Sequence, residues 1–61
     1  MATYDQDWAI KSATELAEEI GHAAAVIRNG RRYSTHDSWK EMPDGWQVVW
    51  LVSTTGKVVR Q

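Results

Sequence analysis

The four glycines of the chain are the feature that most limits its fold. They stand at positions 21, 30, 45 and 56, and each lies in sequence surroundings typical of a turn or a helix end. They divide the chain into short elements. No glycine-rich loop of the kind that cradles phosphate groups is present. We therefore take the glycines as boundaries of secondary structure rather than as parts of a chemical site.

The segment before Gly21 carries the pattern of an amphipathic helix. Ser12-Ala13-Thr14-Glu15 matches a capping box, in which the serine and glutamate side chains bond to backbone amides at the start of a helix. Apolar residues then recur at positions 13, 16, 17 and 20, which is the spacing of one helix face. The pattern predicts a helix over about 12–20, preceded by an extended lead-in over residues 1–11.

Two readings remain open for the residues after Gly21. Glycine is a natural residue just past a helix end, which favours a break there and a strand from about Ala23 to Arg28. That strand would turn at Asn29-Gly30, a dipeptide typical of two-residue hairpins. Alternatively, the three alanines at 23–25 continue the helix, and Gly30 is its cap. The break at Gly21 is favoured, because a longer helix would put Val26 on the charged face.

The C-terminal part of the chain has the pattern of a hairpin. Pro43-Asp44-Gly45 is a turn, and "WQVVWLVS" after it is rich in the β-branched and aromatic residues of strands. Thr54-Thr55-Gly56 closes a short loop, and "KVVR" returns as a second strand. The sequence therefore predicts a single α+β domain over 1–61, with one N-terminal amphipathic helix packed on an antiparallel sheet of three or four strands.

Strict alternation along the strand at 46–53 predicts a sheet with two apolar faces. It places Trp46, Val48, Trp50 and Val52 on one side and Val49 and Leu51 on the other. One short helix can cover only one of these faces, and its mostly small contact residues suit it to the tryptophan side. Val49 and Leu51 would then be exposed, or covered by the lead-in with Trp8, or covered by another chain.

Size and composition favour association with a partner. A domain of 61 residues buries only roughly 60% of the surface its unfolded chain exposes, so its core is marginal. Small domains compensate with disulfides, metals or partner subunits. Cysteine is absent, and His22 and His36 match no metal-ligand spacing, so we expect no metal and no cofactor. A homo-oligomer or a protein partner is the option that remains.

The arginines around Asn29-Gly30 suggest an alternative function. Arginines on a hairpin tip can bind phosphates while an aromatic side chain stacks on a base, as in single-strand binders. They can equally be a solvated tip that blocks edge pairing. Acidic residues outnumber basic ones before residue 22 and the reverse holds after it, although the net charge is only −1. The residues of this nucleic-acid-binding hypothesis are Arg28, Arg31, Arg32, Tyr33, Lys57 and Arg60.

Trp39 is the clearest contact candidate in the sequence. It lies in the polar stretch "STHDSWKEMPDG", where no apolar periodicity explains it. Such a tryptophan is either a lid over the core or an anchor for a partner, because tryptophan is enriched in binding hot spots. Catalysis is not expected: His36-Asp37 with Ser34 or Ser38 lacks the turn geometry of a nucleophile.

We therefore expect a small non-catalytic binding protein, regulatory or inhibitory, that docks on a protein partner or on itself through an apolar sheet face. The candidate contact residues are Trp39, Val49 and Leu51. No signal-peptide pattern and no membrane-spanning apolar run occurs, so we expect a cytoplasmic protein with neither a membrane partner nor a small-molecule substrate. In size, lack of cysteine and tryptophan content, the chain resembles small accessory proteins of phages and plasmids.

Overall fold

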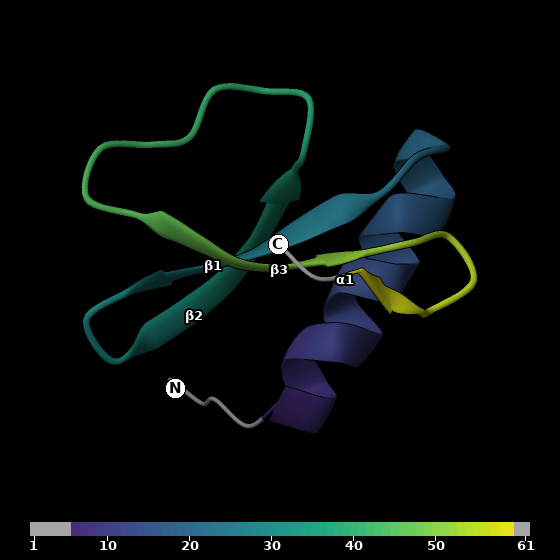
Figure 1. Cartoon of the computed structure of the whole chain (residues 1–61), viewed down its shortest axis with the longest axis horizontal. Helices are drawn as coiled ribbons and strands as arrows, with labels where there is room; N and C mark the ends of the chain where they lie inside the picture. Colours follow the sequence, from purple (N-terminus) through teal and green to yellow (C-terminus); the bar gives the residue numbers. More distant parts are fainter. Residues whose placement is uncertain (1–5, 60–61) are drawn as a thin grey trace.

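A computed structural model describes residues 6–59 and confirms the α+β fold class (Figure 1). One helix, α1 (Gln6–Ile20), precedes four strands: β1 (Ala24–Asn29), β2 (Arg32–Asp37), β3 (Gln47–Val52) and β4 (Val58–Val59). The strands form one antiparallel sheet in the order β2-β1-β3-β4. The helix lies mainly over β1 and β2. None of the helical residues in the described range forms a span long and apolar enough to cross a membrane.

The helix begins earlier than the capping box predicts. It starts at Gln6, so the expected extended lead-in is wrong for residues 6–11, while residues 1–5 lie outside the described part. Ser12 and Glu15 lie inside the helix and not at its start, and the Thr14 hydroxyl between them donates to the Ile10 carbonyl one turn back, at 2.7 Å. The apolar stripe extends back to the buried Ala9, and Asp7 in the first turn interacts favourably with the helix dipole.

The helix ends where the favoured reading predicts. Gly21 has a φ of 81°, in the left-handed region that other residues avoid, and its N–H donates to the Ala17 carbonyl at 2.8 Å. Two residues later the chain enters β1, so the alternative of a helix through to Arg28 is excluded. The short turn after Gly21 places the C-terminal end of α1 beside the start of β1.

The first hairpin turns one residue later than the Asn29-Gly30 dipeptide predicts. Asn29 pairs with Arg32, so the two turn residues are Gly30 and Arg31. Gly30 has a φ of 62°, and no other residue type has a positive φ among the described residues, which fits a turn with glycine in its first central position. Arg28 consequently lies opposite Tyr33 and not opposite Arg31.

A β-bulge in β3 overturns the strict alternation expected there. Trp50 lies opposite Val26 but Val48 lies opposite Ile27, so Val49 has no Cα partner on β1. The bulge shifts the side chains that follow it by one position. Trp50 and Val52 face the helix, and Val49 also packs against the core cluster. Val49 and Leu51 therefore do not share an uncovered face.

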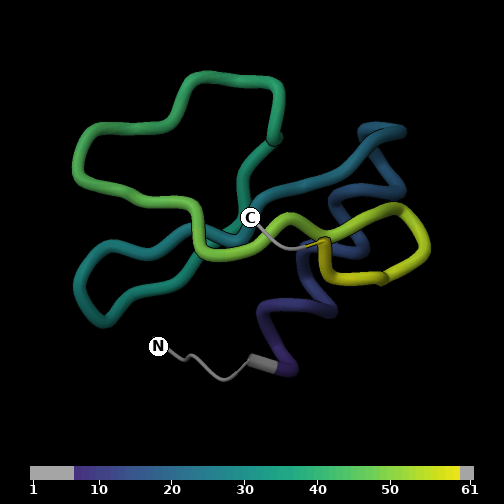
Figure 2. The backbone as a smooth tube through the Cα atoms, viewed as in Figure 1, coloured from purple at the N-terminus to yellow at the C-terminus, as the bar shows by residue number. Residues whose placement is uncertain are grey.

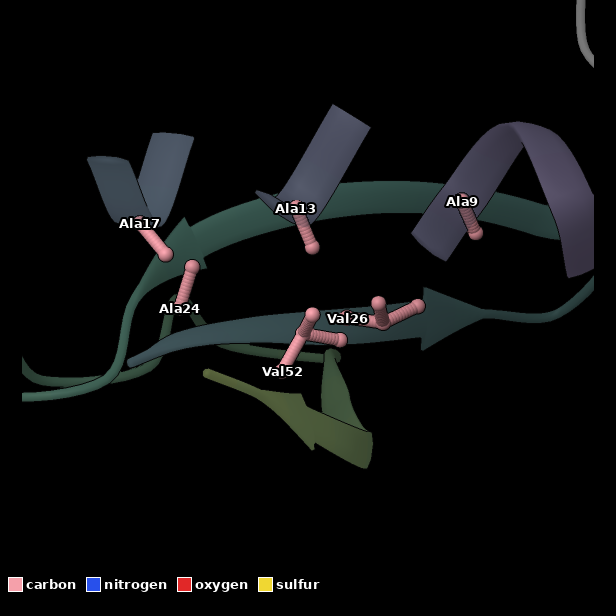
Figure 3. Close-up of a cluster of buried hydrophobic side chains, with 6 residues drawn as sticks. All are labelled: Ala9, Ala13, Ala17, Ala24, Val26 and Val52. Carbon is pink, nitrogen blue, oxygen red and sulfur yellow. The ribbon is translucent and has the colours of Figure 1, made fainter. Parts of the chain in front are cut away.

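The core between helix and sheet is built from small side chains. Ala9, Ala13 and Ala17 recur every fourth residue on α1 and are fully buried against β1 and β3 (Figure 3). Val26 and Val52 are the largest side chains buried completely in the described part of the chain. Small residues at these positions let the helix approach the sheet closely. Larger apolar residues border this cluster and stay partly exposed, among them Ile10, Leu16, Ile20, Tyr33 and Trp50.

The face of the sheet away from α1 is not bare. Ala25 and Ile27, in its centre, are 0% and 3% exposed. The connection between β2 and β3 spans residues 38–46 and runs as a wide loop on the side away from the helix (Figure 2). Two contacts hold the loop against this face. His36 Nε2 lies 3.0 Å from the carbonyl oxygen of Glu41, and Gly45 lies against the side chain of Asn29. The chain thus supplies part of the cover for its own second face.

Candidate protein-binding site at Trp39

The ends of the first hairpin bring Trp39 beside a histidine. Ala24 and Asp37 are the last paired residues of β1 and β2. His22 is two residues before Ala24, and Trp39 is two residues after Asp37. Both therefore lie where the C-terminal end of the helix meets the sheet. Neither sits in a strand, and their positions are set by the hairpin register and by the turn at Gly21.

Two contacts hold Trp39 in place, and a third holds the ring on which it stacks. Its indole ring stacks on the His22 imidazole, with ring centroids 3.6 Å apart and planes 8° from parallel. Its backbone N–H donates to Asp37 Oδ1 at 2.8 Å. The same carboxylate oxygen lies 2.7 Å from His22 Nε2, so one oxygen bonds to both the His22 ring and the Trp39 backbone. The pKa of Asp37 lies below its ordinary value of 3.8, chiefly because of the hydrogen bond with His22 and then the bond from the Trp39 N–H.

The backbone beside this cluster is also anchored. The Ser38 hydroxyl donates to the Ala23 carbonyl at 2.6 Å, which ties the chain after β2 to the chain before β1. The Lys40 N–H donates to the Asp37 carbonyl at 3.1 Å. These bonds make residues 37–40 a fixed turn, although most of the Trp39 side chain is in solvent.

His36, Asp37 and Ser38 do not bond to one another as a hydrolytic group would. Asp37 bonds to His22 and not to its neighbour His36, and the Ser38 hydroxyl is used by the Ala23 carbonyl. His36 points to the other side of the sheet, opposite Ala25, and bonds to the Glu41 carbonyl. Within residues 6–59, no group of three histidine, aspartate or glutamate side chains could hold a metal ion.

Trp39 is the most exposed of the large apolar side chains in the described range. It is 79% exposed, compared with 45% for Trp8 on α1 and 45% for Val59 on β4. The other two sequence-predicted contact residues lie elsewhere. Val49 packs toward the core, and Leu51 is half-buried opposite Ala25. The structure thus does not bring Trp39, Val49 and Leu51 into one patch.

The arginines of the first hairpin lie at the other end of the sheet. Arg28, Arg31 and Arg32 are exposed, and none has an ion-pair partner within the described residues. Arg28 follows Val26 in alternation, so its side chain lies on the same face of the sheet as Val26. Arg32 lies opposite Asn29, on the other face, and Arg31 is in the turn. The three side chains therefore do not share one face.

Of the remaining members of the nucleic-acid-binding hypothesis, Tyr33 lies at this tip, opposite Arg28, and it also packs against the core cluster. Lys57 follows the β3–β4 turn, next to the Val52–Val58 pair, at the end of the sheet where Ala24 lies. Arg60 is outside the described residues. Among the described residues, the structure therefore brings together Arg28, Arg31, Arg32 and Tyr33, and it leaves Lys57 at the other end of the sheet.

Sequence reasoning found Trp39 but missed His22 and Asp37 as its supports. A signal existed: once the hairpin register is known, continuing it two residues past Ala24 and Asp37 places His22 opposite Trp39. The misplaced turn hid that relationship.

The chain has no match in any of three comparisons: with models of protein families, with curated proteins, and with solved structures.

Proposed function

We propose that this chain is a small non-catalytic binding protein of the cytoplasm, regulatory or inhibitory, that docks on a protein partner or on a second copy through a surface centred on Trp39. The observation that carries the proposal is the combination of exposure and order at this residue. The indole is 79% exposed, yet it is stacked on His22 and its backbone is bonded to Asp37.

This combination supports binding for an energetic reason. An aromatic ring that is already held in one orientation loses little conformational freedom when a partner covers it, so more of the buried area contributes to affinity. Tryptophan is also among the residues that most often dominate the binding energy of interfaces. One ring face of Trp39 is occupied by His22, which leaves the outer face as the contact surface.

The sheet face away from α1 is the weaker docking candidate. Its central residues, Ala25 and Ile27, are already buried, and the residue 38–46 connection is tied across it. Leu51 is half-buried there and could contribute only at the margin of an interface. Val49 faces the core and is more consistent with a packing role.

The proposal is tested by affinity purification from the native host after nuclease treatment, with Trp39→Ala compared against Trp8→Ala. Both variants remove an exposed tryptophan, but only the first removes the ring stacked on His22. We expect specific protein partners to be lost with Trp39→Ala and kept with Trp8→Ala. Recovery of the same proteins by wild type and Trp39→Ala would contradict the proposal.

A second candidate is a nucleic-acid-binding module that uses the exposed hairpin arginines. The observation in its favour is that Arg28, Arg31 and Arg32 crowd one tip without an ion-pair partner in the described part of the chain. Three phosphate contacts would give a salt dependence with a slope of roughly −2 to −3 in log–log form. Unchanged gel-shift binding in an Arg31→Ala/Arg32→Ala variant would exclude this candidate.

A further inference from the structure

The Trp39 surface lies beside the negative end of the helix. The last turn of α1 contains Glu18 and Glu19, both exposed, and no basic residue. The C-terminal carbonyls of a helix add partial negative charge at the same end, which favours cations there. His22, on which Trp39 stacks, comes two residues after Ile20, the last residue of α1. The indole is therefore held close to a helix end whose negative charge is not neutralised within its own turn.

A second negative charge is bonded directly to the Trp39 cluster. Asp37 Oδ1 lies 2.7 Å from His22 Nε2 and accepts the Trp39 backbone N–H at 2.8 Å. The bond with His22, and then the bond from the Trp39 N–H, hold the pKa of this carboxyl below its ordinary value, so it is ionised at neutral pH.

Two lysines at this end of the molecule offset only part of the negative charge. Lys40 is exposed and directly follows Trp39, and its charge contributes to the lowered pKa of Asp37, after the bonds from His22 and Trp39. Lys57 lies beside β4, three strands away from β2, which puts it about 14 Å from Asp37. Charges that far apart are screened at physiological ionic strength, where the Debye length is about 8 Å. Lys40 is therefore the lysine whose charge acts on the Trp39 surface.

We propose that the outer face of Trp39 receives an arginine side chain of a separate protein partner. The inference rests on the proposed docking role of Trp39 and names the chemistry of its partner. A guanidinium is planar and stacks on aromatic rings, and tryptophan is the aromatic residue that attracts a cation most strongly. Because His22 already holds the indole in one orientation, the arginine meets a face that needs no reordering.

The charges around Trp39 favour an arginine over other occupants. An acidic side chain would be repelled by the Asp37 carboxylate and by the negative end of α1. An apolar side chain would cover the indole but would desolvate the neighbouring carboxylate without pairing it. A guanidinium covers the indole with its planar face and brings a positive charge toward Asp37.

The preference for a guanidinium is tested by titrating the full chain with three capped glycine peptides while the indole N–H signal of Trp39 is followed by NMR. The peptides differ in one central residue, which is arginine, citrulline or glutamate, and citrulline keeps the planar group without its charge. At physiological ionic strength and about pH 8, where an ordinary imidazole is uncharged, the arginine peptide should bind roughly two- to fivefold tighter than the citrulline peptide. Equal binding of the arginine and citrulline peptides, or tighter binding of the glutamate peptide, would overturn the proposal.

A change of sign at Lys40 tests the charge argument without touching the supports of Trp39. Lys40→Gln removes the nearby positive charge and keeps the backbone N–H that donates to the Asp37 carbonyl. It should tighten the binding of the arginine peptide roughly twofold. Lys57→Gln removes the same charge across the sheet and is the matched control, which should bind as wild type does. If Lys40→Gln weakened binding, or behaved like Lys57→Gln, the proposal would be overturned.

The outcomes separate this inference from the proposed function. If Trp39→Ala loses a protein partner in affinity purification but the titration shows no preference for arginine, the docking role stands and the arginine assignment is wrong. If the titration shows the preference and Trp39→Ala still captures the same proteins, the docking role is wrong and the cation site stands. A Trp39 signal that shifts when the chain alone is concentrated, and not in Arg31→Ala/Arg32→Ala, shows that a second copy supplies the arginine, which overturns a separate partner.

Discussion

The indole of Trp39 lies parallel to the imidazole of His22, with 3.6 Å between the ring centroids and 8° between the planes. The pair joins the turn before β1 to the turn after β2, and one oxygen of Asp37 bonds to both the His22 ring and the Trp39 backbone N–H. An exposed tryptophan would ordinarily sample several rotamers. Here the stack and the shared carboxylate select one, which turns a solvent-exposed ring into an ordered contact surface.

Removal of the ring beneath Trp39 should release it. His22→Ala eliminates the stack and the hydrogen bond to Asp37, and we expect a loss on the order of 1 kcal/mol in the free energy of unfolding. Urea unfolding measures this loss, and the Trp39 side chain should show increased motion by NMR relaxation. His36→Ala, which removes only a bond to the Glu41 carbonyl, is the matched control. Equal order of Trp39 in the wild type and His22→Ala would contradict the role assigned to the stack.

The depressed pKa of Asp37 predicts a loss of stability in acid. The carboxylate has a folded pKa below its ordinary value of 3.8, chiefly because of the bond with His22. Such a group stabilises the fold at pH values above its unfolded pKa, and that contribution is lost as the pH falls through the folded pKa. Unfolding free energy measured below about pH 4 should fall more steeply for wild type than for Asp37→Asn. Identical pH profiles would exclude the carboxylate from this role.

The helix end at Gly21 should depend on the left-handed backbone and not on space. Nothing lies within 4 Å of the position that a Cβ would take, while φ is +81°. Gly21→Ala should therefore cost about 1 kcal/mol of stability through backbone strain alone. Asn tolerates this region better, so Gly21→Asn should cost less. Thermal unfolding of the two variants tests whether Gly21→Asn is the less destabilising. An equal loss of stability would contradict backbone strain as the cause.

The close approach of α1 to the sheet should make its buried alanines intolerant of larger residues. Ala13 is fully buried between Ala9 and Ala17 along the same stripe. Ala13→Leu should destabilise the protein by about 1–3 kcal/mol, because the core has no room for the added atoms. Glu15→Leu, on the exposed side of the same helix, is the control and should change stability little. Denaturant unfolding with no difference between the two variants would show that the helix packs loosely.

Much of the fold could be predicted from glycine positions and strand composition. The break at Gly21 and the turns at Gly45 and Gly56 follow from local residue chemistry, which acts over a few residues. The helix start was mispredicted because a capping-box pattern can also occur inside a helix, as that of Ser12 and Glu15 does here. Only the packing of the alanine stripe against the sheet decides whether such a pattern lies at the start of a helix or inside it.

The contact surface was only partly predictable, because it depends on pairing between segments distant in sequence. Trp39 stands out in its polar loop, but His22 became its neighbour only through the register of β1 with β2. The bulge at Val49 was invisible to alternation, since two residues there oppose one on β1. That single irregularity removed Val49 from the surface expected beside Leu51.

The docking role of Trp39 is tested most directly by NMR signals of the indole N–H groups. The chain has four tryptophans, and point variants assign each signal. As partner is added, or as the chain itself is concentrated, we expect the Trp39 signal to shift most and the Trp8 signal to stay nearly constant. Saturable binding that leaves the Trp39 indole signal unmoved while other tryptophans shift would contradict the account.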